Sequence, residues 1–257
     1  MTSIEMPSPP LLLTPRLPRT WYFWGTTIFG SLAHGAMLLA QVVVLVAAAL
    51  FRFGGAEMPE AQVKAFMHQG DTIAVATIAA SPVMLVVLGI AIRLARRRFA
   101  GYLALRWPSK TQLLGGLAVM FGFMVVWEVL LSVFGRTPPA YVLDSVRTAR
   151  ESGSLWLLLI AGCLVAPVIE EFSVRGFLYR GWSKSFLGPA GAILLSSALW
   201  TLLHVQYGWI DLAGVFLLGL LFGYWRYRSG STWLTVIMHG SWNAVIMVQV
   251  ALTLPRA

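Results

Sequence analysis

Seven long apolar stretches, separated by short polar connections, dominate this chain of 257 residues. Each stretch is close to the roughly 20 residues that an α-helix needs to cross a hydrocarbon core of about 30 Å. We therefore predict an all-α fold, a polytopic transmembrane helix bundle with about seven spans. The expected spans are Trp21–Phe51, Thr72–Leu94, Leu113–Phe134, Leu155–Trp182, Gly188–Gln206, Trp209–Tyr227 and Thr232–Leu254.

The composition favours a membrane bundle over a soluble domain. Hydrophobic residues make up 58% of the chain and charged residues 11%, against about 25% charged residues in a typical soluble domain. The net charge of +9 would suit nucleic acid, but the basic residues lie mostly between apolar spans. We expect the lipid bilayer as a partner and no nucleic acid. The single cysteine, Cys163, lies inside a span and excludes an intrachain disulfide or a cysteine-based zinc cage.

The distribution of positive charge predicts an orientation. One set of flanks holds twelve basic residues: Arg16, Arg19, Arg93, Arg96, Arg97, Arg98, Arg106, Lys110, Arg180, Lys184, Arg226 and Arg228. The opposite set holds six: Arg52, Lys64, Arg136, Arg147, Arg150 and Arg256. Acidic residues are interleaved only with the second set, namely Glu57, Glu60, Asp71, Asp144 and Glu151. Because cytoplasmic connections carry the excess of positive charge, we expect a cytoplasmic N-terminus and a C-terminus outside.

The spans divide the chain into three expected parts. Residues 1–20 form a proline-containing cytoplasmic tail without the long apolar core of a cleavable signal peptide. Residues 21–154 hold the first three spans and their loops, including a cytoplasmic interfacial segment at 96–110. Residues 155–257 hold the last four spans.

Two adjacent glutamates, Glu170 and Glu171, lie inside the fourth expected span. A carboxylate at the centre of a membrane helix costs roughly 2.5–3.5 kcal/mol on insertion scales, so each should have a partner. Arg175 follows Glu171 by four residues and faces it on a helix, whereas Glu170 points about 100° away. Glu170 therefore needs a partner on another helix, and a carboxylate in such a low-dielectric site is suited to accept a proton.

The hairpin of the fourth and fifth spans supplies that partner. Glu170 precedes Leu187, at the turn, by 17 residues, and His204 follows Leu187 by 17 residues. Residues equidistant from the turn of an antiparallel hairpin lie at the same depth, so Glu170 and His204 are expected to meet. Trp200 precedes His204 by four residues, and its ring is expected to pack over the imidazole.

The seventh span carries His239 and Asn243 at the same helical spacing of four residues. Both side chains can donate hydrogen bonds. With Glu170 and His204 they make up the groups needed to activate a water against a carbonyl and to stabilise the resulting oxyanion.

These motifs, in this order, resemble the type II CAAX prenyl endopeptidase family, the glutamate intramembrane proteases and their bacterial relatives. The matching segments are EEFSVR with Glu170, Glu171 and Arg175, WTLLH with Trp200 and His204, and HGSWN with His239 and Asn243. The resemblance covers about Leu155 to Leu254. The chain departs from the family pattern at Trp200, where the family usually has phenylalanine, and the aromatic character is kept.

The resemblance implies a membrane-embedded protease without a cofactor. Glu170 and His204 would activate the water, His239 and Asn243 would hold the oxyanion, and Glu171 with Arg175 would support the site or orient the substrate. The implied substrate is a peptide or a membrane protein, with or without a lipid group. The implied location is the bacterial cytoplasmic membrane.

Two other classes of protein fit the same residues. In a zinc-dependent membrane metalloprotease, Glu170, His204 and His239 would be the metal ligands, although the chain lacks an HExxH motif. In a non-catalytic scaffold or immunity-type protein, the fold would persist without turnover. His34 is expected to be structural, Glu128 has no partner that the sequence identifies, and Gly214, Gly219 and Gly223 are expected to allow close helix packing.

Overall fold

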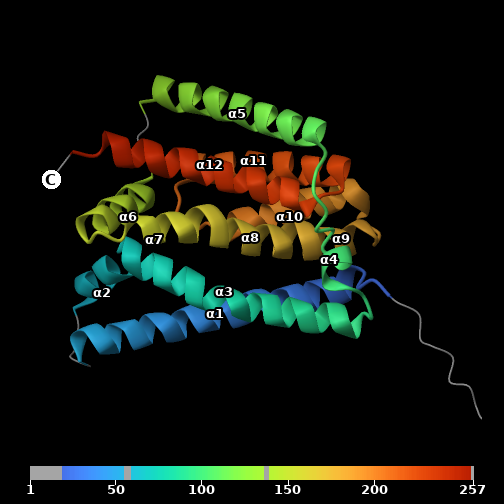
Figure 1. Ribbon diagram of the computed structural model, residues 1–257, viewed down its shortest axis with the longest axis horizontal. Helices are drawn as coiled ribbons and strands as arrows, with labels where there is room; N and C mark the ends of the chain where they lie inside the picture. Colours follow the sequence, from blue (N-terminus) through green and yellow to red (C-terminus); the bar gives the residue numbers. More distant parts are fainter. Residues whose placement is uncertain (1–18, 55–58, 136–138, 256–257) are drawn as a thin grey trace, which may run out of the picture.

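The computed structural model describes residues 19–54, 59–135 and 139–255, and these ranges form helices without a strand (Figure 1). Most of the expected N-terminal tail lies outside the described residues. The same holds for four charged residues of the orientation argument, namely Arg16, Glu57, Arg136 and Arg256.

Six of the expected spans correspond to helical segments long and apolar enough to cross a membrane. They are α1 (Phe23–Phe53), α3 (Gly70–Leu94), α5 (Lys110–Val133), the composite segment Leu155–Ser183, α11 (Trp209–Ser229) and α12 (Thr232–Thr253). The shorter apolar α10 (Gly188–Leu202) takes the place of the fifth expected span. The chain is therefore an integral membrane protein, and the predicted all-α polytopic bundle is confirmed. Three short helices lie between the spans: α2 (Glu60–Met67), α4 (Phe99–Tyr102) and α6 (Ala140–Glu151).

The helix of the fifth expected span ends at Leu202, four residues earlier than we predicted. Its 15 residues extend about 22 Å at 1.5 Å per residue, which is less than a hydrocarbon core. The side chain of His204 bonds the carbonyl of Trp200 at 2.8 Å, and the backbone N–H of His204 bonds Thr201 instead. A side chain that takes a carbonyl of the last turn ends the helical hydrogen-bond pattern. His204 consequently lies in a turn beyond the helix.

The fourth span is interrupted by two π-helical segments. In chain order it consists of α7 (Leu155–Ile160), η1 (Ala161–Val165), α8 (Ala166–Glu171), η2 (Phe172–Leu178) and α9 (Tyr179–Ser183). Pro167 has no N–H to donate to the carbonyl of Cys163, four residues before it, so the regular pattern is already broken there. Such π-helical turns are rare and occur frequently at functional sites. The two glutamates lie at the end of α8, between the two interruptions.

The composite fourth span lies at the centre of the bundle (Figure 1). It packs on one side against α3, which pairs with α1, and on the other side against α12. Helices α10 and α11 pack together, and α5 lies outermost against α11 and α12. This arrangement places the two glutamates between the first and the last helices of the chain.

Close helix packing at the glycines of α11 is confirmed. A β-carbon added to Gly223 would lie 2.7 Å from Ile193, and one added to Gly219 would lie 3.0 Å from Ser197. A β-carbon added to Gly214 would lie 2.7 Å from Trp127. The first two positions bring α11 against α10, and the third brings it against α5.

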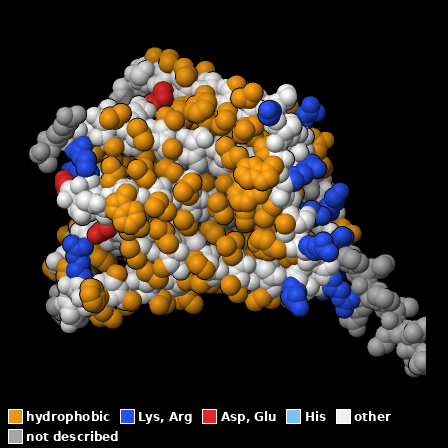
Figure 2. Space-filling view, viewed as in Figure 1, with side chains coloured by type: hydrophobic (Ala, Val, Ile, Leu, Met, Phe, Trp, Pro, Cys, Tyr) orange, Lys and Arg blue, Asp and Glu red, His pale blue; other side chains and the backbone are white. Residues whose placement is uncertain are grey.

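Charge is divided between the two ends of the bundle. On the face shown in Figure 2, basic side chains gather at one end, where α4, α9 and the end of α11 lie. At the other end, basic and acidic residues pair: Lys64 with Glu60 at 2.7 Å, Arg147 with Asp144 at 2.6 Å and Arg52 with Asp71 at 3.8 Å. This is the asymmetry on which the predicted orientation depends.

Candidate active site within the bundle

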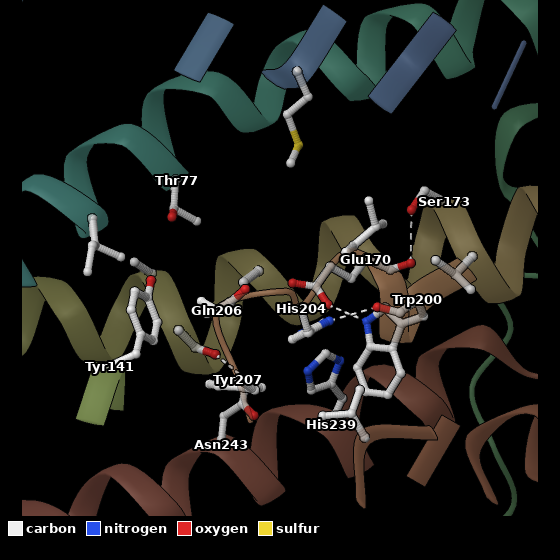
Figure 3. Close-up of a pocket in the computed structure, with 18 of the residues that line it drawn as sticks. Thr77, Tyr141, Glu170, Ser173, Trp200, His204, Gln206, Tyr207, His239 and Asn243 are labelled. Carbon is white, nitrogen blue, oxygen red and sulfur yellow. Dashed lines mark hydrogen bonds between the residues drawn. The ribbon is translucent and has the colours of Figure 1, made fainter. Parts of the chain in front are cut away.

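A cavity of about 340 Å³ lies inside the bundle, within the size range of small-ligand sites. Glu170, His204, His239 and Asn243 all line it. Figure 3 shows these side chains approaching the same space from α8, from the turn after α10 and from α12. Two further polar residues of that turn, Gln206 and Tyr207, also line the cavity.

The wall of the cavity extends beyond the last four spans, which sequence reasoning did not predict. Helices α1, α3 and α6 complete it, with polar side chains at His34, Gln41, Thr77, Tyr141 and Ser145. Helix α6 was expected to be part of a loop. Its buried residues Val142, Ser145, Val146 and Ala149 follow the spacing of an amphipathic helix, and this spacing was the available signal.

Trp200 connects the two candidate bases. Its indole Nε1 donates to Oε2 of Glu170 at 2.6 Å, and its backbone carbonyl lies 2.8 Å from Nδ1 of His204 (Figure 3). Its ring also contacts the imidazole of His204 edge to face, with centroids 5.0 Å apart, which confirms the predicted packing. The expected direct meeting of Glu170 and His204 is replaced by this indirect link, because no hydrogen bond joins the two among the described residues.

The contact with Trp200 determines the tautomer of His204. A carbonyl oxygen can only accept, so Nδ1 carries the proton and Nε2 of the neutral ring holds a free lone pair. The ring of Tyr207 stacks on the imidazole, with centroids 5.7 Å apart. His204 is thus held between two aromatic rings and is only partly buried. Glu170 is also partly buried, and its Oε1 has no hydrogen-bond partner in the described part of the chain.

Glu171 and Arg175 form the predicted ion pair at 2.9 Å, and neither side chain is exposed to solvent. The same Oε1 of Glu171 lies 3.1 Å from Nδ1 of His239. The guanidinium of Arg175 also donates to the carbonyl of Gly219 at 3.2 Å and stacks on Trp200 at 4.5 Å. His239 was expected to donate a hydrogen bond in the site. The structure shows that Glu171 orients its ring through Nδ1.

Asn243 is anchored by one of its two amide hydrogens. Its Nδ2 donates to the carbonyl of Gly162, in η1, at 2.8 Å. Close packing keeps α12 in this position, since a β-carbon on Gly240 would lie 2.5 Å from the carbonyl oxygen of Cys163. The second amide hydrogen of Asn243 remains for a ligand in the cavity.

Two partly buried tyrosines that line the cavity were not singled out by the sequence. Burial raises the pKa of Tyr141 and of Tyr207, and the charge of Glu170 raises both further. Both phenols therefore stay neutral and able to donate a hydrogen bond at physiological pH. Their rings meet edge to face, with centroids 6.2 Å apart.

The alternative zinc ligands do not form a cluster. Among the residues that the structure describes, no three His, Cys, Asp or Glu side chains are grouped so that they could hold a metal ion. Oε2 of Glu170 accepts a hydrogen bond from Trp200, and Nδ1 of His239 is hydrogen-bonded to Glu171. Neither of these two atoms is therefore available as a ligand to a shared metal ion.

The similarity to known proteins lies in the same segment that carries the candidate site. Residues 152–245 match the family model described as type II CAAX prenyl endopeptidase Rce1-like, and all seven candidate site residues lie in this range. The chain is also similar to the UPF0177 protein YbdI of Lactococcus lactis subsp. lactis (strain IL1403). The two are 25% identical over 152 residues, which cover 54% of this chain and 80% of that relative. No solved structure matches the chain.

The chain is an integral membrane protein, and its segment 152–245 is similar to the type II CAAX prenyl endopeptidases. The resemblance of the three motifs to the type II CAAX prenyl endopeptidases is confirmed over residues 152–245.

Proposed function

We propose that this chain is a membrane-embedded endopeptidase that hydrolyses a peptide bond with a water activated by Glu170 and His204. The observation that carries the proposal is that four residues of the family-matched segment, Glu170, His204, His239 and Asn243, line one cavity. A carboxylate with an open oxygen, an imidazole with a free lone pair and two oriented polar side chains line the same space. No cofactor enters the proposed reaction.

In the proposed attack, Glu170 accepts a proton from the water through its open Oε1. Nε2 of His204 accepts a hydrogen bond from the same water and orients it. The water oxygen forms a bond with the peptide carbonyl carbon, and the carbonyl becomes an oxyanion. The indole of Trp200, bonded to Oε2, keeps the carboxylate plane fixed during this step. The oxyanion then re-forms the carbonyl as the C–N bond breaks, and Glu170 passes its proton to the departing amine.

The oxyanion is stabilised by His239 and by Asn243 in this proposal. Because Nδ1 of His239 donates to Glu171, its Nε2 can donate to the oxyanion only when the ring is protonated. Glu171 is placed to stabilise that imidazolium, and Asn243 contributes its second amide hydrogen. Preorganised donors of this kind are each worth about 10²–10³-fold in rate.

The substrate class that fits the site is a peptide or a membrane protein, lipidated or not, that reaches the cavity inside the bilayer. We place the catalytic core in residues 155–257, with walls from α1, α3 and α6, and the protein in a bacterial cytoplasmic membrane. A comparison of membrane proteomes with wild-type protein and with an inactive variant would identify the cleaved chains.

The test of the mechanism is Glu170→Gln. The amide keeps an oxygen that can accept from Trp200 but loses basicity, so the fold should stay nearly intact while cleavage falls by about 10²–10⁴-fold or more. Turnover and thermal unfolding of the purified variant are the measurements, with Glu128→Gln, on α5 and outside the cavity, as the matched control.

Three outcomes would contradict the proposal. Near-normal cleavage by Glu170→Gln would exclude Glu170 as the base. Loss of wild-type activity on chelation, restored by zinc, would favour the metalloprotease. Membrane proteomes unchanged between wild type and Glu170→Gln, at equal protein levels, would favour a scaffold without turnover.

A further inference from the structure

A second pocket, of about 500 Å³, lies at the end of the bundle where the basic residues gather. Three arginines from three elements line it: Arg106 after α4, Arg180 on α9 and Arg226 in the last turn of α11. Small residues, Gly101 and Gly230 among them, leave room between the guanidinium groups. This pocket shares no lining residue with the catalytic cavity.

Backbone carbonyls hold each guanidinium in place. Arg106 donates to Gly230 at 2.8 Å and to Ser229 at 2.9 Å, and Gly230 has the positive φ of 63° that glycine adopts without strain. Arg180 donates to Gly101 at 2.9 Å, and Nε of Arg226 donates to the carbonyl of Arg175 at 3.0 Å. These bonds fix the positions of the charges but do not neutralise them.

In the part of the chain that the structure describes, the three charges lack a carboxylate partner. None of the three arginines forms an ion pair with an acidic side chain in the described ranges, and Arg226 is only 6% exposed. Nε of Arg180 is buried and has no hydrogen-bond partner there. The faces of Tyr102 and Tyr179 lie 5.1 Å from Arg180 and 5.2 Å from Arg226, but a ring face carries no net charge. A buried, unpaired guanidinium is costly, so the pocket is best completed by an anion.

We propose that this pocket binds a phosphate group, supplied by the headgroup of an anionic phospholipid. Forked guanidinium donors match the oxygens of a phosphate, and three of them exceed what a single carboxylate requires. The pocket also lies at the ends of membrane helices, since the span at Leu155–Ser183 and α11 both end beside it. Basic residues that serve only to orient the protein have no need to converge on one pocket.

The experiment uses the full-length protein in neutral detergent. Binding of phosphatidylglycerol is measured by native mass spectrometry and by the shift in unfolding temperature, with phosphatidylcholine and inorganic phosphate as comparison probes. Arg180→Gln and Arg106→Gln remove single donors of the pocket. Arg228→Gln is the matched control, because Arg228 is exposed in the same last turn of α11 and does not line the pocket.

We expect Arg180→Gln and Arg106→Gln each to weaken phosphatidylglycerol binding by about 10-fold, and Arg228→Gln to change it less than about twofold. Unfolding temperatures without lipid report whether each variant is folded. Arginine-dependent binding of inorganic phosphate alone would support the phosphate site and assign it to a soluble anion. Equal weakening in all three variants, or equal binding of phosphatidylcholine and phosphatidylglycerol, would overturn the proposal.

Discussion

Trp200 shows how one residue can organise the two sides of a candidate site. Its side chain fixes Glu170, and its backbone carbonyl fixes the tautomer of His204. The family to which the segment is similar usually has phenylalanine here, which would keep the ring and lose the hydrogen bond to the carboxylate. The exchange noted in the sequence therefore has a specific consequence for how Glu170 is held.

We predict different effects for two substitutions of Trp200. Trp200→Phe should lower kcat/KM by about 10-fold, because a hydrogen bond to a charged group is worth roughly 1.5–3 kcal/mol and water replaces part of it. Trp200→Ala should also cost about 3–5 kcal/mol of stability, since the side chain is only 2% exposed. Turnover and thermal unfolding separate the two effects. Equal destabilisation by both variants would show that the indole N–H, and not the ring, supports the fold.

Glu171 serves both Arg175 and His239, so its removal should affect stability and chemistry together. Glu171→Gln strands the buried guanidinium of Arg175 and should cost roughly 3–5 kcal/mol in the free energy of unfolding. His239 also loses the carboxylate that its Nδ1 contacts at 3.1 Å, so activity per folded molecule should fall by a further factor of about 10 or more. Turnover corrected for the folded fraction, measured beside thermal unfolding, separates this loss from the destabilisation. Activity that falls only in proportion to folded protein would remove His239 from the proposed oxyanion site.

At the scale of elements, the contact between α12 and η1 positions half of the candidate site. Gly240 lies on α12 between His239 and Asn243 and faces the carbonyl of Cys163. That carbonyl has no α-helical donor because Pro167 follows four residues later. The helix interruption and the glycine therefore allow one close approach, which sets the depth at which His239 and Asn243 enter the cavity.

Gly240→Ala tests this contact. The added methyl group would lie 2.5 Å from a backbone oxygen, so the helices must separate, at a cost of about 1–3 kcal/mol. Activity should fall by more than the loss of folded protein explains, because His239 and Asn243 move with α12. Gly122→Ala, on α5, is the control, since nothing lies within 4 Å of its β-carbon. An equal loss of activity in both variants would exclude close packing as the cause.

At the scale of the whole molecule, the separation of charge predicts which end faces the cytoplasm. A reporter fused after Ala257 should behave as extracytoplasmic, and one inserted at Arg97 as cytoplasmic. Alkaline phosphatase and a fluorescent protein, active on opposite sides of a bacterial membrane, provide the measurement. The reverse pattern would overturn the orientation, and cytoplasmic signals from both positions would show that the span count is wrong.

The sequence alone determined the helical class, the approximate spans and the local pairs. Backbone groups in lipid must be satisfied within each segment, so an apolar run of this length forms a helix whatever surrounds it. The pairing of Glu171 with Arg175 and the packing of Trp200 on His204 depend only on the geometry of a single helix turn, and both are present.

Tertiary structure decided what depends on contacts between distant segments. Two hydrogen bonds of the site join residues far apart in the chain, namely that of the Trp200 indole to Glu170 and that of His239 to Glu171. The cavity wall likewise brings α1, α3 and α6 to the last four spans. The early end of α10 follows from the contact of the His204 side chain with a carbonyl of the last turn, and the first π-helical segment lies where Pro167 lacks a backbone donor. Periodicity records which face of a helix is apolar but not which helix it meets. The roles of the candidate residues therefore stay predictions, while their placement around one cavity is a property of the folded bundle.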